Sequence, residues 1–87
     1  MDALNNINIL YISNCNEELI DNLNNLYYLA NKSFIDNYKI ISKQKNLFIL
    51  KVFNTSIKTN NKKLDFNLFL LFKFSIINNY NYIIFQT

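Results

Sequence analysis

Residues 64 to 77 of this 87-residue chain read LDFNLFLLFKFSII, and this stretch decides which fold the sequence predicts. The even-numbered positions from Leu64 to Ile76 are all apolar, and alternate side chains of a strand point to one face of a sheet. Among the odd-numbered positions, only Phe69, Leu71 and Ile77 are apolar. The alternation therefore predicts a strand over 64–77.

A second apolar run, LFILKVF at 47–53, comes before this strand, and the polar segment NTSIKTNNKK at 54–63 separates the two. The run at 47–53 is rich in aromatic and branched residues, which favour strands. Because the polar segment contains no Gly and no Asn-Gly or Asp-Gly pair, we expect a long loop in place of a tight turn. The two runs are thus predicted to form a long hairpin with a basic loop over 54–63.

The rest of the chain predicts one α+β domain over 1–87. Alternation predicts a strand over 6–13, and a stripe of leucines predicts a helix over 15–32, capped by Asn14. We interpret 34–53 as an extended connection that leads into the strand at 47–53. After an asparagine-rich turn at 78–81, a last short strand is predicted over 81–86.

The composition indicates an AT-rich genome. The chain contains 18 Asn, 13 Ile and nine Lys, and it has no Gly, Pro, His, Trp or Arg. The common residues can be written in A and T codons, whereas Gly and Pro require G or C. Mitochondria and plastids of protists, and some large viruses, have such genomes. Composition leaves these sources open, and many asparagines then need no binding role.

Catalysis has little support in this sequence. It lacks His, a glycine-rich phosphate loop and any multi-cysteine cluster, so we expect no enzyme, no cofactor, no metal site and no small-molecule substrate. The single Cys15 is expected to be a small buried or half-buried residue. The most apolar run, Leu68 to Phe72, is far shorter than the about 20 residues that span a bilayer. A membrane span is therefore not expected.

The lysines are the stronger candidates for binding. The net charge is +3, and lysines supply point charges that suit phosphates better than base-specific readout. Plain solvation would also explain any single lysine. As a group near one end of the predicted hairpin, six of them favour RNA: Lys39, Lys43, Lys45, Lys58, Lys62 and Lys63. Lys73, farther along the predicted strand over 64–77, completes the candidate set.

The aromatic residues allow two interpretations. They could form a base-stacking platform, although core packing explains their alternation better. The members of this set are Phe66, Phe69, Phe72, Phe74, Tyr80, Tyr82 and Phe85. Because one helix cannot cover both faces of a four-stranded sheet, Phe69, Leu71 and Ile77 are predicted to contact another protein.

Four stretches resemble the small-subunit ribosomal protein ten family, the S-ten proteins. Its opening I-x-I-x-L strand corresponds to Ile7-Asn8-Ile9-Leu10-Tyr11, and its helix has an apolar face like that of Leu19, Ile20, Leu23 and Leu26. Its F-T-V-L-R-S strand corresponds to Leu47-Phe48-Ile49-Leu50-Lys51-Val52. Its K-K-S-R-x-Q-F-E loop corresponds to Lys62-Lys63-Leu64-Asp65-Phe66-Asn67.

The resemblance implies a ferredoxin-like βαββαβ sheet in the head of the small ribosomal subunit. Together with the AT-rich composition, it leads us to expect an organelle-encoded protein of the mitochondrial matrix. The basic loop would reach rRNA and neighbouring ribosomal proteins, with lysines on phosphates. The prolines, arginines and histidine of the family are missing here, and its second helix does not fit into 78–81. We therefore expect that this helix has been lost.

Two other functions fit the same sequence. The chain would suit an accessory subunit of an organellar respiratory membrane complex, since AT-rich organellar genomes encode many short hydrophobic proteins. It would also suit a small viral regulator that binds a host protein through an exposed sheet. RNA in the purified assembly would favour the ribosome over both.

Overall fold

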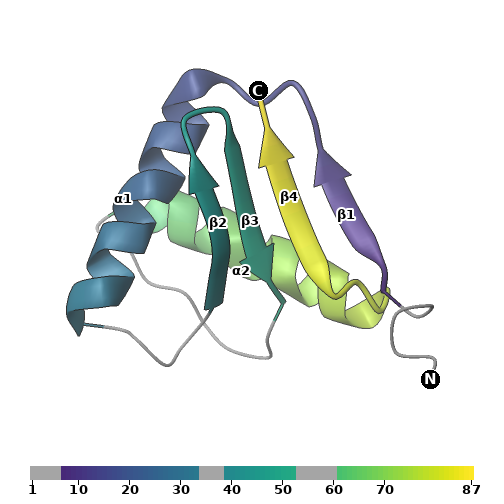
Figure 1. Cartoon of the computed structure of the whole chain (residues 1–87). Coiled ribbons are helices and arrows are strands. Elements are labelled where there is room, and N and C mark those ends of the chain that lie inside the picture. Colours follow the sequence, from purple (N-terminus) through teal and green to yellow (C-terminus); the bar gives the residue numbers. More distant parts are fainter. Residues whose placement is uncertain (1–6, 34–38, 53–60) are drawn as a thin grey trace.

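The computed structural model describes residues 7–33, 39–52 and 61–87, and these form four strands and two helices (Figure 1). Their order along the chain is strand, helix, strand, strand, helix, strand. The elements are β1 (Ile9–Ile12), α1 (Glu17–Ser33), β2 (Lys39–Gln44), β3 (Leu47–Lys51), α2 (Lys62–Ile77) and β4 (Tyr82–Gln86). The fold is therefore α+β, with a four-stranded sheet and two helices.

The sheet is mixed, and its strands lie in the order β1-β4-β3-β2. β1 pairs with β4 in parallel, while β4 with β3 and β3 with β2 pair antiparallel. In a ferredoxin-like sheet every neighbouring pair is antiparallel and the first strand lies inside the sheet. Here β1 lies at an edge, so the sheet does not show the ferredoxin-like strand order.

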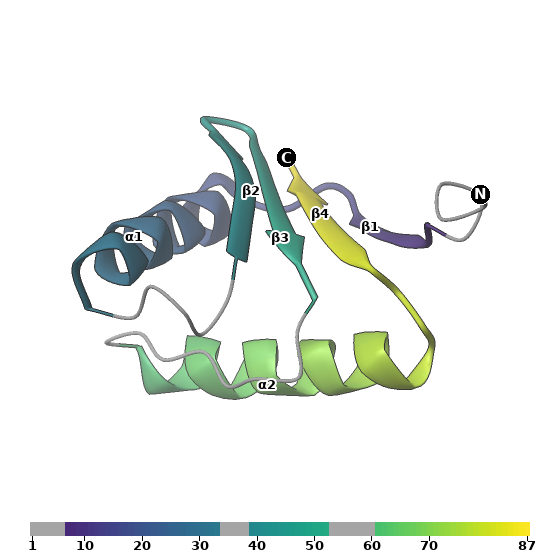
Figure 2. The same cartoon turned by 60° about the horizontal axis from the view of Figure 1, so that its bottom comes forward.

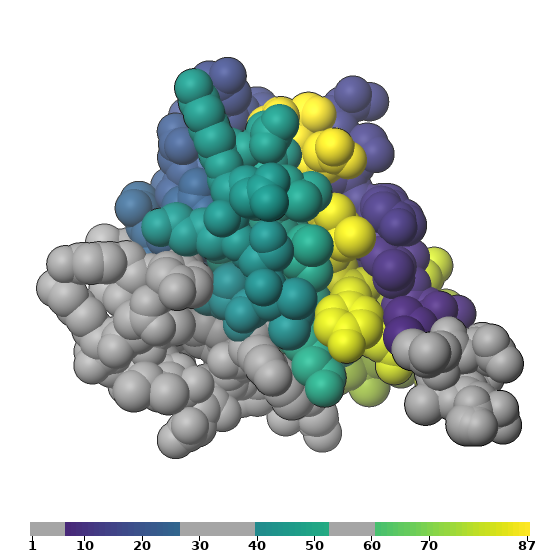
Figure 3. Space-filling view, viewed as in Figure 1, coloured from purple at the N-terminus to yellow at the C-terminus, as the bar shows by residue number. Residues whose placement is uncertain are grey.

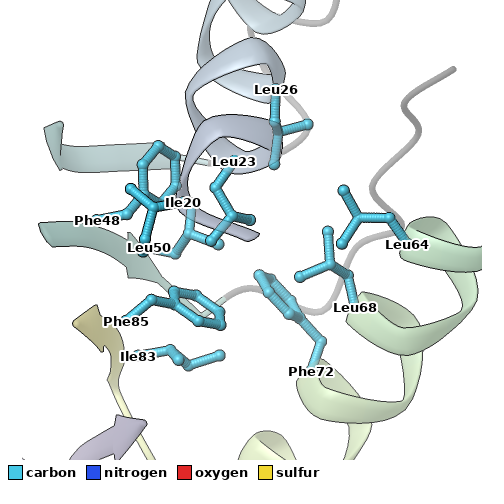
Figure 4. Close-up of a cluster of buried hydrophobic side chains, with 10 residues drawn as sticks. All are labelled: Ile20, Leu23, Leu26, Phe48, Leu50, Leu64, Leu68, Phe72, Ile83 and Phe85. Atoms are coloured by element: carbon cyan, nitrogen blue, oxygen red, sulfur yellow. The ribbon is translucent and has the colours of Figure 1, made fainter. Parts of the chain in front are cut away.

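Both helices lie on one face of the sheet, and the core is enclosed between them and the strands (Figure 2). Figure 4 shows the side chains of α1, α2, β3 and β4 meeting in this layer, with Phe72 and Phe85 pointing into the same space. The buried apolar side chains are Ile20, Leu23, Leu26, Phe48, Leu50, Leu64, Leu68, Phe72, Ile83 and Phe85. One continuous core thus joins the helices to the two central strands.

The prediction of a strand over 64–77 is wrong, because these residues belong to helix α2. The run has apolar residues at both even and odd positions, so it fits a helix as well as a strand. In the helix, Leu64, Leu68 and Phe72 are spaced four residues apart and are buried on one side. A run of 14 residues exceeds the usual length of a strand, which was the signal for a helix. The second helix has therefore not been lost.

Asparagines begin and end α2. The side-chain oxygen of Asn61 accepts a hydrogen bond from the backbone N–H of Leu64, which is a helix N-cap. At the other end, Asn79 has a left-handed φ of 61°, and Tyr80 N–H donates to the Ser75 carbonyl at 2.8 Å. This is a Schellman ending in which Asn takes the usual position of Gly. The ring of Tyr80 stacks on Phe74.

The hairpin lies earlier in the chain than predicted. β2 pairs with β3 across the turn at Lys45 and Asn46, so the segment 34–53 contains two strands in place of a connection and one strand. The predicted basic loop over 54–63 does not join two strands. Its residues 54–60 lie outside the described part of the chain, Asn61 is a cap, and Lys62 and Lys63 begin α2.

The other predicted elements lie close to observed ones. The helix predicted over 15–32 corresponds to α1, which begins at Glu17, and the strands predicted over 6–13 and 81–86 contain β1 and β4. The cap of α1 is Asn16 and not Asn14, because the Asn16 side-chain oxygen accepts from the N–H of Leu19 at 2.9 Å. Asn14 instead has a left-handed φ of 58°.

Candidate functional site

No helix or strand of the described residues covers the face of the sheet opposite α1 and α2. Figure 3 views this face, in which the strands form the surface and neither helix lies in front of them. The register of the paired strands places alternate residues here, because their neighbours along each strand pack against the core. On β1, β3 and β4, the open sheet face consists of Ile9, Tyr11, Leu47, Ile49, Lys51, Tyr82, Ile84 and Gln86.

Two tyrosines and a lysine are the candidate binding side chains of the open sheet face. Tyr11 lies on β1 and has 63% of its surface exposed, while Tyr82 lies on the neighbouring strand β4 and is half-buried. Tyr82 pairs with Ile9 on one side and with Lys51 of β3 on the other. The register therefore brings two aromatic rings and an ammonium group to one side of three adjacent strands.

This arrangement suits a single-stranded nucleic acid. Unpaired bases stack on aromatic side chains that lie flat on a sheet, and each stacked base contributes about 1 to 3 kcal/mol. A nearby lysine can neutralise the phosphate that links two stacked bases. The apolar residues Ile49 and Ile84 between these groups would exclude water from the contact.

The predicted RNA-binding lysines do not gather at one hairpin tip. Lys43 lies exposed on β2, and Lys45 lies on the turn between β2 and β3. Figure 1 shows this turn at the top of the sheet. Lys62 and Lys63 begin α2 behind the sheet, and Lys73 lies on the exposed side of α2. Lys58 and the side chain of Lys39 lie outside the described part, although the Lys39 backbone pairs with Lys51.

Acidic groups lie beside one of these lysines. Lys45 shares a surface hollow with Glu17 and Asp21 at the start of α1, and Asn46 and Thr87 complete its lining. These carboxylates oppose the approach of a phosphate. Lys45 is therefore a weaker candidate for RNA than its exposure alone would indicate.

Lys62 and Lys63 occupy the first turn of α2, where the helix dipole already supplies positive charge. Lysine side chains are electrostatically unfavourable at this end of a helix, and a bound anion would reduce the repulsion. A hollow of about 540 Å³ lies between the starts of the two helices and is lined by both N-cap asparagines, Asn16 and Asn61, together with Lys63 and Glu18. This is a second place where a phosphate group could be held, although the carboxylate of Glu18 opposes it there.

The predicted protein-contact residues all lie on α2. Phe69 and Ile77 are exposed on its outer side, with 70% of Ile77 accessible, whereas Leu71 is half-buried and packs against the core. Leu71 faces the sheet because it lies one helical turn before the buried Ser75, whose hydroxyl donates to the Leu71 carbonyl at 2.7 Å. Phe69 and Ile77 therefore lie on the exposed side of α2, whereas Leu71 lies on the side that faces the core.

Sequence reasoning did not select Tyr11 and Lys51, and it assigned Tyr82 to the core by preference. The sequence feature that could have identified them is the alternation of side chains along β1, β3 and β4. Each of these three residues lies one position away from a residue that faces the core. That signal becomes usable only when the buried phase of each strand is known. The buried phase depends on where the helices pack.

Neither a metal-ligand cluster nor a membrane-spanning helix occurs among the described residues. Within 7–33, 39–52 and 61–87, no three metal-ligating side chains come together. The same ranges contain no helix long and apolar enough to cross a bilayer. The thiol of Cys15 is half-buried and donates to the Ile12 carbonyl at 3.3 Å.

Comparison with protein-family models, with curated proteins and with solved structures finds no match to this chain.

Proposed function

We propose that this chain is an RNA-binding structural constituent of the small subunit of an organellar ribosome, in the mitochondrial matrix. The observation that carries this proposal is the open sheet face, where Tyr11, Tyr82 and Lys51 share one side of three adjacent strands. A surface of this kind stacks unpaired bases without reading their sequence. Such binding suits a protein that holds rRNA in place.

Two further features support the ribosomal assignment. The order of elements along the chain is the βαββαβ order of the S-ten family it resembles, and the asparagine-rich, arginine-free composition fits an AT-rich organellar genome. The strand order departs from the ferredoxin-like sheet that the resemblance implies. The Lys62-Lys63 pair also stands at the start of a helix, where the family has a loop.

The phosphate contacts would come from two places. Lys51 lies on the open sheet face beside Tyr82, and Lys62 and Lys63 lie at the start of α2 on the other side of the sheet. A protein embedded in folded rRNA is contacted from several directions, so lysines on both sides are consistent with this environment. Neighbouring ribosomal proteins would cover the remaining apolar surface.

The test is binding of the purified chain to a single-stranded RNA of about 12 nucleotides, followed by fluorescence anisotropy. Tyr11→Ala and Tyr82→Ala should each weaken binding about fivefold or more, because each removes one stacking ring. Tyr11→Phe and Tyr82→Phe keep the rings and should bind as the natural chain does. Equal affinity of the alanine and phenylalanine variants would overturn the proposed RNA surface.

A further inference from the structure

Helix α2 carries apolar side chains on its outer side as well as on its buried side. A helix that packs against a sheet by one face normally turns polar residues outward. Here six large apolar residues are exposed, with 60% of Phe66 accessible. We call them the outer face of α2, and they are Phe66, Phe69, Leu70, Phe74, Ile76 and Ile77.

The size of the outer face is typical of a contact surface. With whole aromatic side chains of about 150 to 250 Å², the exposed fractions amount to roughly 600 Å². This lies at the upper end of the largest apolar patch on an ordinary monomer, and such patches mark interaction sites. It approaches the roughly 800 Å² that each partner contributes to a stable protein interface.

Lys73 stands in the middle of the outer face. Phe66, Leu70, Lys73 and Ile77 are spaced at four, three and four residues, so they follow one line along the helix. The ammonium nitrogen of Lys73 lies 5.7 Å from the centre of the Phe69 ring, in cation–π geometry. Any partner that covers the apolar residues must therefore also cover this charge.

That charge restricts the partner. Removing an ammonium group from water without a compensating anion opposes binding strongly, whereas a carboxylate opposite it removes the penalty. The same helix has two more lysines, Lys62 and Lys63, exposed in its first turn, and its Asp65 is not among the exposed residues. The exposed charges of α2 are thus positive at its start and at its middle.

We infer that the outer face of α2 docks an amphipathic helix of a partner protein, whose apolar stripe carries a carboxylate opposite Lys73. Two helices pack by interdigitating their side-chain ridges, and the line from Phe66 to Ile77 provides one such ridge. Lys73 would set the register of the pair, as a polar residue within an apolar seam does. This inference does not depend on RNA binding by the open sheet face.

Other occupants fit the charge less well. A second copy of this chain would bring another Lys73 to the seam, and its own outer face holds no carboxylate to pair with it. A lipid surface would meet the apolar residues with Lys73 at the centre of the inserted side, although lysines of membrane-surface helices normally flank that side. Both alternatives are distinguished in the test.

The test uses the whole chain and two synthetic helical peptides of about 18 residues with the same leucine stripe. One peptide carries a single Glu at the centre of the stripe, and the other carries Gln at the same position. We expect the Glu peptide to bind at least tenfold more tightly in fluorescence anisotropy, and backbone NMR shifts to concentrate on α2. Lys73→Gln should reduce this ratio to near one, while Lys45→Gln, on the β2–β3 turn, should leave it unchanged.

Three results would overturn the inference. The first is equal affinity for the two peptides, and the second is peptide-induced shifts outside α2. The third is a stronger response of α2 to another occupant, either phosphatidylglycerol vesicles or a second copy detected by sedimentation equilibrium. Circular dichroism of Lys73→Gln should match that of the natural chain, since the side chain is exposed.

Discussion

Asn8 and Asn81 hold the start of the parallel strand pair together by reciprocal hydrogen bonds. Asn8 N–H donates to the Asn81 side-chain oxygen at 2.8 Å, and Asn81 N–H donates to the Asn8 carbonyl at 2.8 Å. The Asn81 carbonyl also accepts from Val52 N–H, directly after β3, at 2.9 Å. One asparagine thus joins the segments around β1, β3 and β4, so this asparagine has a structural role and is not mutational background.

Replacing Asn81 by Ala should lower the free energy of unfolding by about 0.5 to 1.5 kcal/mol, because Asn8 N–H loses its side-chain acceptor. Urea denaturation followed by circular dichroism measures the change. Asn25→Ala is the control, since Asn25 lies exposed on α1 and Ala favours a helix. An Asn81 variant as stable as the Asn25 variant would show that the reciprocal bonds contribute nothing.

Replacing Asn79 by Gly and by Ala should change the stability of the chain in different ways. Its left-handed φ of 61° costs Ala about 1 kcal/mol, whereas Gly adopts it freely. Asn79→Ala is therefore expected to lower the melting temperature, and Asn79→Gly to keep or raise it. Calorimetry of the two variants gives the comparison, and similar melting temperatures would contradict the Schellman ending of α2.

The first turn of α2 should show opposite effects on stability and on RNA binding. Lys62→Glu replaces a cation by an anion at the positive end of the helix, so the free energy of unfolding should rise by roughly a few tenths of a kcal/mol at low salt. RNA affinity should fall in the same variant, because a phosphate contact is lost and a repulsive charge is added. Lys62→Gln should give smaller changes in both quantities, and an unaltered RNA affinity would remove Lys62 from the RNA surface.

Leu68 and Leu70 test the helix directly, because a strand would place both on one face. In α2, Leu68 is 2% exposed and Leu70 is 47% exposed. Leu68→Ala should therefore cost about 2 to 5 kcal/mol of unfolding free energy, and Leu70→Ala less than about 1. Denaturant titration of both variants provides the values, and equal costs would restore the strand.

Local signals predicted part of this fold. The helix near 15–32 and the strand near 81–86 were recognisable because each has its apolar residues in one phase and a turn beside it. Residues 64–77 were predicted as a strand because Phe66, Leu70 and Ile77 are apolar although they are exposed. The outer side of the helix therefore lacks the polar residues that normally reveal a period of 3.6. The same property makes α2 a candidate docking element.

The sheet order and the open sheet face could not be predicted from the sequence. The pairing of Ile9 with Tyr82 joins residues at opposite ends of the chain, and no local pattern specifies such a partner. Without that pairing, the sequence does not show which residues of β1 and β4 face solvent. Nothing then distinguishes Tyr11 as a candidate binding residue. The lysines were visible as a group, but their separation onto β2 and α2 follows from the same distant contacts.

Sedimentation of organellar ribosomes tests the proposed function most directly. An epitope-tagged chain should be found with the small subunit in a sucrose gradient, and ribonuclease should release it into the light fractions. The Tyr11→Ala, Tyr82→Ala double variant should shift toward the light fractions without ribonuclease. Recovery of the natural chain in a detergent-extracted membrane complex that contains no RNA would contradict the account.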